Sequence, residues 1–176
     1  MTSDTKPKEV AVELTISGKT VRIGGVCKGA GMIQPGMATM LAFITSDVAI
    51  EPRALKSALT IAVGQSFNCI TVDGDMSTND SVITLSNGMA GNSKIRYPNP
   101  TFQDALNFVC LELAKMIVRD GEGVSRFVTL HIRGARNASE AERAARSMLA
   151  SRSSSSRATS EIASPGWPAR PVRPMR

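Results

Sequence analysis

The sequence predicts an α/β fold, because segments with the two-residue hydrophobic period of strands alternate with segments that have the longer period of amphipathic helices. Apolar residues alternate with polar or small ones from Glu9 to Ile16, which is the pattern of a half-buried strand. Ser17-Gly18-Lys19 forms a short turn, and Thr20–Ile23 returns as a second strand. The chain is therefore expected to begin with a β-hairpin.

The later elements are predicted from the same patterns and from helix-start signals. The continuous apolar run Met40–Ser46 is typical of a strand buried on both faces. Thr101 and Asp104 have the spacing of an N-terminal cap for a long amphipathic helix. After the strand at 40–46, we expect a helix from Pro52 through Val63, a strand at Cys69–Val72, a helix from Thr101 through Ile117, a strand at Phe127–Ile132 and a short helix capped by Ser139 that continues to Leu149.

Composition predicts a globular chain without an export signal or a membrane span. The sequence has 176 residues, of which 42% are hydrophobic, so it can bury a sizeable core. No apolar run approaches the roughly 18 residues of a transmembrane helix, and MTSDTKPKEV at the N-terminus lacks the hydrophobic core of a signal peptide. Cys27, Cys69 and Cys110 are scattered without metal-site spacing. We therefore expect a cytoplasmic protein with reduced thiols.

The net charge of +6 comes mainly from residues 152–176, which contain five arginines and the single acidic residue Glu161. The remaining residues, 1–151, have a net charge of only +2, which gives no support for nucleic-acid binding by the folded part. Residues 152–176 are rich in Arg, Ser and Pro and have no apolar periodicity. We predict that this tail is disordered and that the domain spans residues 1–151.

The segment Lys28–Leu41 is the strongest candidate for a functional site. Its glycines and Pro35 interrupt any helix, and its methionines make it too apolar for an exposed loop. The glycine spacing matches neither of the common phosphate-binding loops. The acidic loop with Asp73, Asp75 and Asp80 lacks the spacing of a calcium loop, which favours an ordinary turn, and no metal site is predicted.

Thr39 within this segment is a candidate nucleophile. A threonine at the start of a chain has its own general base, because its α-amine lies within reach of its hydroxyl and has a pKa near ~8. For Thr39 this requires cleavage of the bond between Ala38 and Thr39. From spacing alone, an ordinary buried threonine is the favoured interpretation.

Three sequence motifs instead favour the interpretation of Thr39 as a nucleophile. KGAGMIQPGMATMLAFITSD, SFNCITVDGDMSTNDSV and RDGEGVSRF follow one another in this order. Together they closely resemble the ornithine acetyltransferase (glutamate N-acetyltransferase) family of arginine biosynthesis, from about Thr2 to Ser151. The resemblance implies a cytoplasmic α/β protein with helices packed on a mixed sheet. It also implies self-cleavage between Ala38 and Thr39 into two chains that stay associated.

The resemblance further implies a double-displacement mechanism. Thr39 would take the acetyl group from N-acetylornithine as an ester and pass it to glutamate. Lys28 corresponds to the family's substrate-binding lysine, Glu122 to the acid that meets the substrate amino group, and Thr2 to a substrate-binding threonine. Bifunctional members of the family also accept acetyl-CoA as donor, and no other cofactor is implied. Association into an oligomer with further chains of the family is expected, without nucleic-acid or membrane partners.

Family members are longer, and this sequence resembles their middle region. Their oxyanion-hole Thr-Gly pair has no counterpart here, and loss of such a donor commonly slows a reaction by a factor of about a hundred to a thousand. The alternative to an active acetyltransferase is therefore a catalytically inactive remnant that acts at most as a folded interaction module.

The tail suggests a second hypothesis, a frameshift. Where the family continues with a Ser-Pro-Leu-Val-Lys-like sequence, residues 151–155 are Ser-Arg-Ser-Ser-Ser. A one-base shift converts codons for the first sequence into codons for the second. The nucleotide sequence of the gene tests this hypothesis, because another reading frame must then encode a family-like continuation.

Overall fold

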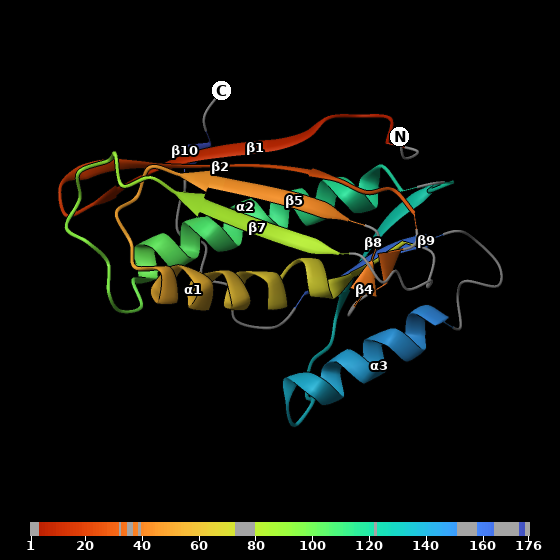
Figure 1. Ribbon diagram of the computed structural model, residues 1–176. Helices are drawn as coiled ribbons and strands as arrows, with labels where there is room; N and C mark the ends of the chain where they lie inside the picture. The colour runs from red at the N-terminus through yellow and green to blue at the C-terminus, as the bar shows by residue number, and fades with distance from the viewer. Residues whose placement is uncertain are drawn as a thin grey trace.

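A mixed β-sheet with helices on one face forms the main body of the protein, for which we describe a computed structural model (Figure 1). The structure describes residues 4–31, 33–34, 37–38, 40–72, 80–121, 123–150, 158–163 and 173–174. In chain order the elements are β1 (Lys8–Ile16), β2 (Lys19–Lys28), β3 (Ile33–Gln34), β4 (Met37–Ala38), β5 (Leu41–Ser46), α1 (Pro52–Gly64), the 3₁₀ turn η1 (Phe67–Cys69), β6 (Ile70–Thr71), β7 (Ser81–Ser86), α2 (Pro100–Arg119), β8 (Arg126–His131), α3 (Ala138–Ala150), β9 (Ala158–Ala163) and β10 (Arg173–Pro174).

The main sheet has the strand order β10-β1-β2-β5-β7. β1 pairs with β2 and β2 pairs with β5 in antiparallel fashion, whereas β5 and β7 are parallel. Helices α1 and α2 pack against each other and lie on the same side of this sheet (Figure 1). The predicted α/β class, with helices packed on a mixed sheet, is confirmed.

The predicted β1–β2 hairpin is confirmed and has a two-residue loop. Ile16 pairs with Lys19, and the loop residues Ser17 and Gly18 have φ angles of 50° and 74°. Positive φ at both loop positions gives the type I′ turn, whose twist matches that of the flanking strands. Gly18 adopts this conformation without the steric cost that a side chain would add.

Strand β2 is longer than predicted and reaches Lys28, because Gly25 allows helix α2 to approach the strand backbone. A Cβ atom at Gly25 would lie 2.8 Å from Cδ1 of Leu113 and 3.0 Å from Cγ1 of Val109. Both of these α2 side chains are fully buried. Close packing at Gly25 therefore supports the strand that ends at the predicted substrate-binding lysine.

Strand β5 corrects one prediction about burial. The run Met40–Ser46 was expected to be buried on both faces, but only one face is buried. Ala42 and Ile44 point into the core, while Phe43 is 40% exposed. Alternate side chains of a strand point to opposite faces, and the helices cover only one of them. The prediction was wrong because a continuous apolar run does not show that both faces are covered.

On the face of the sheet that the helices do not cover, apolar side chains form a row across three paired strands. Val26 of β2 is in register with Phe43 of β5, and Phe43 is in register with Ile83 of β7. All three are more than a third exposed, as is Leu85 further along β7. A cavity of about 560 Å³ opens on this face beside Val26, Phe43 and Thr45. The sequence patterns did not predict β7, whose largest apolar side chains face outward.

Helix α1 begins at Pro52 as predicted, but helix α2 begins earlier than its predicted cap. The N-terminal cap of α2 is Asn99, whose Oδ1 accepts a hydrogen bond of 2.9 Å from the Phe102 backbone N–H. Pro100 occupies the first helical position, where its fixed φ suits the helix and no N–H is needed. The predicted cap, Thr101, lies inside the first turn, so that prediction was wrong.

We expect replacement of the Asn99 cap to weaken the fold measurably. Asn99→Ala leaves the Phe102 N–H without its acceptor and should lower the free energy of unfolding by about 1 kcal/mol. Thr101→Ala is the matched control, because Thr101 is exposed and should change the free energy by less than about 0.5 kcal/mol. Urea unfolding of both variants measures the difference. A larger loss for Thr101→Ala than for Asn99→Ala would contradict the assignment of the cap.

Helix α3 also begins from an asparagine rather than from the predicted serine. Asn137 Oδ1 accepts a hydrogen bond of 2.9 Å from the Glu140 N–H, and Ser139 lies within the helix. The Glu140 carboxylate in turn accepts a hydrogen bond of 2.8 Å from the Arg136 N–H. The predicted cap at Ser139 was wrong by two residues, while the helix itself and its acidic first turn match the prediction.

A second sheet has the order β6-β9-β8, and its middle strand comes from the tail that was predicted to be disordered. β9 pairs antiparallel with β6 and parallel with β8, and β10 pairs with β1. At residues 158–163 and 173–174 the structure therefore differs from the prediction. β9 supplies backbone partners to both β6 and β8, which the segment Ala158–Ala163 can do because it contains no proline. The other tail residues lie outside the described ranges.

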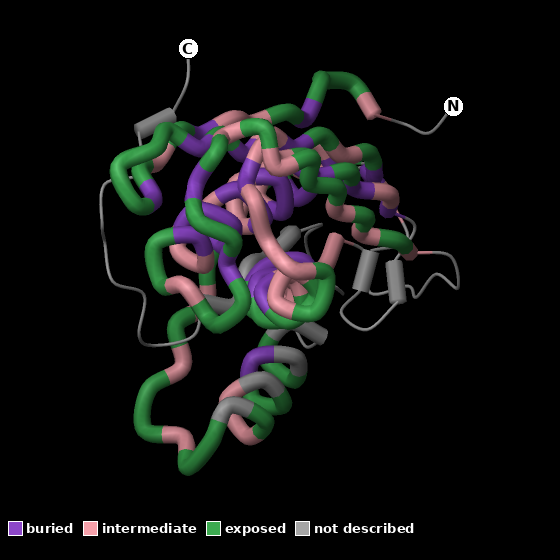
Figure 2. Tube along the Cα trace, turned by 60° about the vertical axis from the view of Figure 1, so that its left-hand side comes forward, coloured by how far each residue is buried: buried purple, intermediate pink, exposed green. Residues whose placement is uncertain are grey.

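The core lies between α2 and the inner face of the sheet (Figure 2). Val12, Val21 and Ile23 supply the strand side of the core, and each is at most 1% exposed. On α2, the residues at the spacing of one helical face are fully buried: Leu106, Val109, Leu113 and Ile117. Among the described helices, none combines the length and the apolar character needed to cross a bilayer.

Candidate active site

Two of the predicted site residues, Lys28 and Ala38, lie at the ends of strands. Lys28 is the last residue of β2, is exposed, and lies in register with Leu41 of β5. Ala38 is the last residue of β4 and pairs with Ile33. The other predicted site residues lie outside the residues that the structure describes: Thr2, Thr39 and Glu122. Described residues close to them in the sequence show how the surrounding chain is held.

The backbone of Met40, which follows Thr39, is held at both its N–H and its carbonyl. Its N–H donates a hydrogen bond of 2.7 Å to Asp80 Oδ1, and its carbonyl accepts one of 3.1 Å from the Ser81 N–H. The Met40 side chain is buried. Burial raises the pKa of Asp80 above its ordinary value, and the hydrogen bond from Met40 opposes this rise. Asp80 and Ser81, from the second motif, thus anchor the chain directly after the predicted cleavage point.

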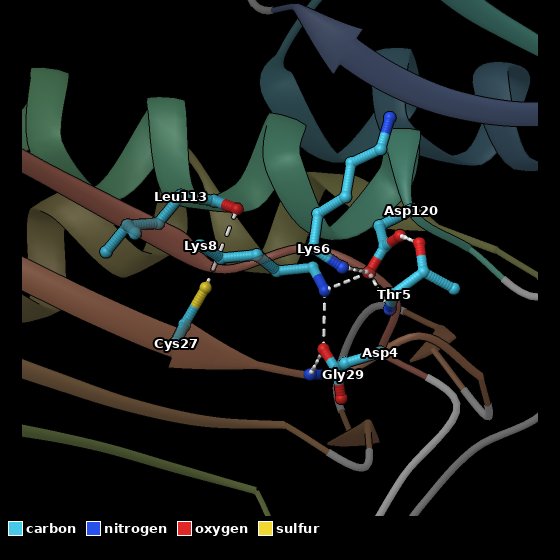
Figure 3. A network of polar contacts seen from close by, with 8 residues as sticks. All are labelled: Asp4, Thr5, Lys6, Lys8, Cys27, Gly29, Leu113 and Asp120. Atoms are coloured by element: carbon cyan, nitrogen blue, oxygen red, sulfur yellow. Dashed lines mark hydrogen bonds and ion pairs between the residues drawn. The ribbon is translucent and has the colours of Figure 1, made fainter.

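A buried lysine forms the centre of a polar network that reaches Gly29, the residue after Lys28 (Figure 3). The Lys8 side chain is 1% exposed, and its Nζ lies 2.5 Å from Asp4 Oδ1 and 2.5 Å from Asp120 Oδ2. Asp4 Oδ1 also accepts a hydrogen bond of 3.0 Å from the Gly29 N–H. We call Lys8, Asp4 and Asp120 the Lys8 triad. It joins the N-terminal segment, the end of β2 and the end of α2.

Asp120 binds the N-terminal segment through further hydrogen bonds. Its Oδ2 accepts from the backbone N–H of Thr5 at 3.0 Å and of Lys6 at 3.4 Å, and its Oδ1 accepts from the Thr5 hydroxyl. Asp120 is the C-terminal cap of α2, with its own N–H directed back to the last turn of the helix. The segment that follows Thr2 is therefore fastened to the residue that lies two positions before Glu122.

The charges of the Lys8 triad stabilise one another. Burial disfavours the charged form of Lys8, but hydrogen bonds and attraction from Asp120 and Asp4 raise its pKa above the ordinary value. Burial also disfavours the charged form of Asp120, yet the hydrogen bonds from Lys8 and Thr5 lower its pKa to about 2. At neutral pH both groups are therefore ionised.

Gly121 fixes the chain between Asp120 and Glu122 by close packing. A Cβ atom at Gly121 would lie 2.6 Å from Cγ2 of Val124 and 2.7 Å from Cγ1 of Val72. Real Cβ atoms do not approach this closely, so a side chain at this position would displace its neighbours. The glycine of the RDGEG motif therefore brings the start of the predicted substrate-binding segment against Val72, the residue that follows β6.

Cys27 and Cys110 are not candidates for the nucleophile. Cys27, Cys69 and Cys110 are free thiols. Burial raises the pKa of Cys27 and of Cys110 to about 12, so both are protonated at neutral pH and unreactive.

Residues next to all four predicted substrate-contacting positions are thus held within one connected region. Asp4, two positions after Thr2, and Asp120, two positions before Glu122, both bind Lys8, and Gly29, which follows Lys28, donates its N–H to Asp4. Met40 follows Thr39 and leads into β5, which pairs with the end of β2. The roles of Thr2, Lys28, Thr39 and Glu122 themselves stay predictions.

Sequence reasoning missed the Lys8 triad, although one signal was present. Lys8, Val10, Val12, Leu14 and Ile16 occupy alternate positions of β1, and the strand turns these positions toward the core. A charged residue at an inward-facing position requires a partner of opposite charge. The sequence does not show which carboxylates provide it, because Asp120 is 112 residues away along the chain.

Comparison with known proteins places the chain in a family. A model of the ArgJ family matches residues 1–163. The glutamate N-acetyltransferase of Methanocaldococcus jannaschii is 51% identical over 144 residues, which cover 80% of this chain and 35% of that protein. The arginine biosynthesis bifunctional protein ArgJ of Symbiobacterium thermophilum is 50% identical over 143 residues, which cover 80% of this chain and 36% of that protein.

A solved structure shows the same relationship. The crystal structure of arginine biosynthesis bifunctional protein ArgJ from Bacillus halodurans has a TM-score of 0.51 and 40% sequence identity, and the match covers 56% of this chain and 47% of that chain. The chain spans about a third of the length of the curated relatives it matches. On the family match and on these identities, the chain belongs to the ArgJ family.

Proposed function

We propose that this chain is a cytoplasmic acetyltransferase that moves an acetyl group from N-acetylornithine to glutamate through an ester on Thr39. The observation that supports this function best is the convergence of the residues next to the predicted substrate-contacting positions on the Lys8 triad and the β2–β5 pair. The names of the relatives, glutamate N-acetyltransferase among them, support the same reaction class.

Self-cleavage activates the nucleophile in this proposal. Breaking the bond between Ala38 and Thr39 frees the α-amine of Thr39, which then serves as the general base for its own hydroxyl. The anchored peptide group of Met40 gives the new N-terminus a fixed starting point at the beginning of β5. Preorganisation of this kind lowers the entropy that must be lost when the nucleophile meets the acetyl carbon.

The two chains produced by cleavage stay together because they share the main sheet. The first chain contains β1 and β2, and the second contains β5, β7 and α2. β2 pairs with β5 from Ile23–Ser46 to Lys28–Leu41, and α2 packs on both β1 and β2. Separation would expose the buried side chains of this interface to water. Assembly with further chains of the family belongs to the same proposal.

The transfer proceeds in two balanced half-reactions. The Thr39 oxygen attacks the acetyl carbonyl of N-acetylornithine, the carbon–nitrogen bond breaks, and the amine of ornithine leaves with the proton that the α-amine of Thr39 had taken. The free amine of glutamate then attacks the ester carbonyl. N-acetylglutamate leaves, and a proton from the attacking amine returns to the Thr39 oxygen.

The remaining predicted residues orient the two amino acids. The Lys28 ammonium pairs with a substrate carboxylate, and its exposed position at the end of β2 is open to an incoming ligand. Glu122 accepts hydrogen bonds from the substrate amino group, and Thr2 adds a hydroxyl contact. Acetyl-CoA is a candidate second donor, because the same oxygen attack applies to a thioester.

Two measurements on the purified chain test this function. Intact-mass analysis is expected to find two chains that begin at Met1 and Thr39. Incubation with N-acetylornithine and glutamate is expected to yield N-acetylglutamate, and a parallel incubation with acetyl-CoA shows whether a thioester is accepted. An uncut chain that transfers no acetyl group would overturn the proposal and favour an inactive remnant.

A further inference from the structure

We infer that Lys8 is the positioning residue of the site, because it holds in place the segments that carry the proposed substrate-binding residues. This inference rests on the proposed function for the roles of Lys28 and Glu122. The Lys8 ammonium touches Asp4 and Asp120, and Asp4 holds the Gly29 N–H next to Lys28 (Figure 3). Lys8 does not itself contact the reacting atoms in this account.

The burial of the Lys8 triad shows why the three groups depend on one another. The exposed fractions of the Lys8 and Asp120 side chains are 1% and 6%, so water contributes little to the solvation of either charge. A buried charge is tolerated only when it is paired and hydrogen-bonded. Lys8 supplies that pairing for both carboxylates at once, so its removal takes an ammonium contact from Asp4 and from Asp120 together.

The location of the triad points to positioning rather than to core stability. The apolar core is formed between α2 and the strands by residues such as Val12, Leu106 and Leu113. The triad lies beyond that core, where the N-terminal segment, the end of β2 and the end of α2 meet (Figure 3). Buried ion pairs often add little net stability compared with apolar side chains, but they can fix one arrangement of the groups around them.

Lys8 holds the segment next to Lys28 and the segment that leads to Glu122 in one arrangement. Gly29 is adjacent to Lys28, and Asp120 is separated from Glu122 by the tightly packed Gly121. One substrate amino acid must bind a cation through its carboxylate and an acid through its amine at the same time. A shift of about 1 Å in such a pair can weaken catalysis by about a hundredfold.

Lys8→Met tests the inference, because methionine keeps much of the length of the side chain and removes its charge. We expect at least about tenfold weaker binding of glutamate, measured by calorimetry, because the two ends of the site are no longer held together. We also expect faster amide exchange at Gly29, Thr5 and Lys6, with unchanged exchange in the centre of the β1–β2 hairpin. The matched control is Lys115→Met, which removes a partly buried pair with Glu112 within α2 and should leave both readouts unchanged.

The outcomes separate this inference from the proposed function. Unchanged glutamate affinity and unchanged Gly29 exchange in Lys8→Met would overturn the positioning role. If the parent chain binds neither glutamate nor N-acetylornithine, the proposed function fails, and the exchange at Gly29 alone decides whether Lys8 positions this segment. Should Lys8→Met fail to fold, Asp4→Ala releases Gly29 while leaving the Lys8–Asp120 pair. It is expected to show faster exchange at Gly29 with unchanged exchange at Thr5 and Lys6, whose N–H groups bind Asp120, and to weaken glutamate binding, and unchanged glutamate affinity would overturn the positioning role.

Discussion

Thr39→Ala is expected to abolish both self-cleavage and acetyl transfer. The variant lacks the only hydroxyl that the proposed mechanism uses as nucleophile, so no ester can form. Removal of an enzyme's nucleophile typically lowers kcat by roughly 10⁴-fold or more. Intact-mass analysis measures the cleavage, and formation of N-acetylglutamate from N-acetylornithine and glutamate measures the transfer.

Two further variants make the Thr39→Ala result specific. Thr39→Ser keeps a hydroxyl and should retain measurable cleavage and transfer at a lower rate. Thr45→Ala is the matched control, because Thr45 is exposed on the outer face of β5 and has no role in the mechanism. Thr39→Ala protein that is cut between residues 38 and 39, or that still transfers acetyl groups, would rule out Thr39 as the nucleophile.

Leu113→Ala is expected to cause a large loss of stability. Leu113 is fully buried, and its Cδ1 occupies the space above Gly25 where a side chain would otherwise stand. Truncation to alanine removes apolar contacts and leaves a cavity, which costs about 2–5 kcal/mol. Because small domains have a total stability of only about 5–15 kcal/mol, the variant should unfold at much lower urea concentration.

Leu85→Ala provides the matched comparison for Leu113→Ala. Leu85 is the same residue type, but it is 61% exposed on the outer face of β7. Its truncation is expected to change the free energy of unfolding by less than about 0.5 kcal/mol. Equal losses for the two variants would show that α2 does not pack on β2 as described.

Elements with a clear hydrophobic period could be predicted from the sequence, and elements defined by their neighbours could not. The β1–β2 hairpin and α1 follow directly from alternation, a turn and Pro52. Strand β7 is short and has adjacent apolar residues, Val82 and Ile83, so it shows no alternation. It becomes a strand because β5 provides the backbone partners on one side.

The N-terminal caps of α2 and α3 show that residue type alone does not identify the capping residue. Asparagine, threonine and serine are all good N-terminal caps, so composition does not choose among nearby candidates. The Asn99-Pro100 pair decides the start of α2, because proline fits the first helical position and does not require an N–H partner. At α3, the capping side chain is Asn137, which precedes the predicted Ser139 by two residues.

The motifs of the candidate site led to its proposal, but the contacts that hold the surrounding segments could not be predicted from them. Lys28 and the Ala38–Thr39 bond were identified from residue type and resemblance, without any three-dimensional information. The pairing of Lys8 with Asp120 depends on how the end of α2 meets the start of β1. Such contacts between distant segments of the chain arise only from tertiary packing, which periodicity does not encode.

The most direct test of the account is to trap the acetyl group on the protein. Incubation with N-acetylornithine in the absence of glutamate, followed by peptide mass spectrometry, should locate one acetyl group on the peptide that begins with Thr39. Addition of glutamate should then remove this group and release N-acetylglutamate. Acetylation at another residue instead, or no acetylation of a chain that is cut between Ala38 and Thr39, would contradict the acetyl-threonine mechanism.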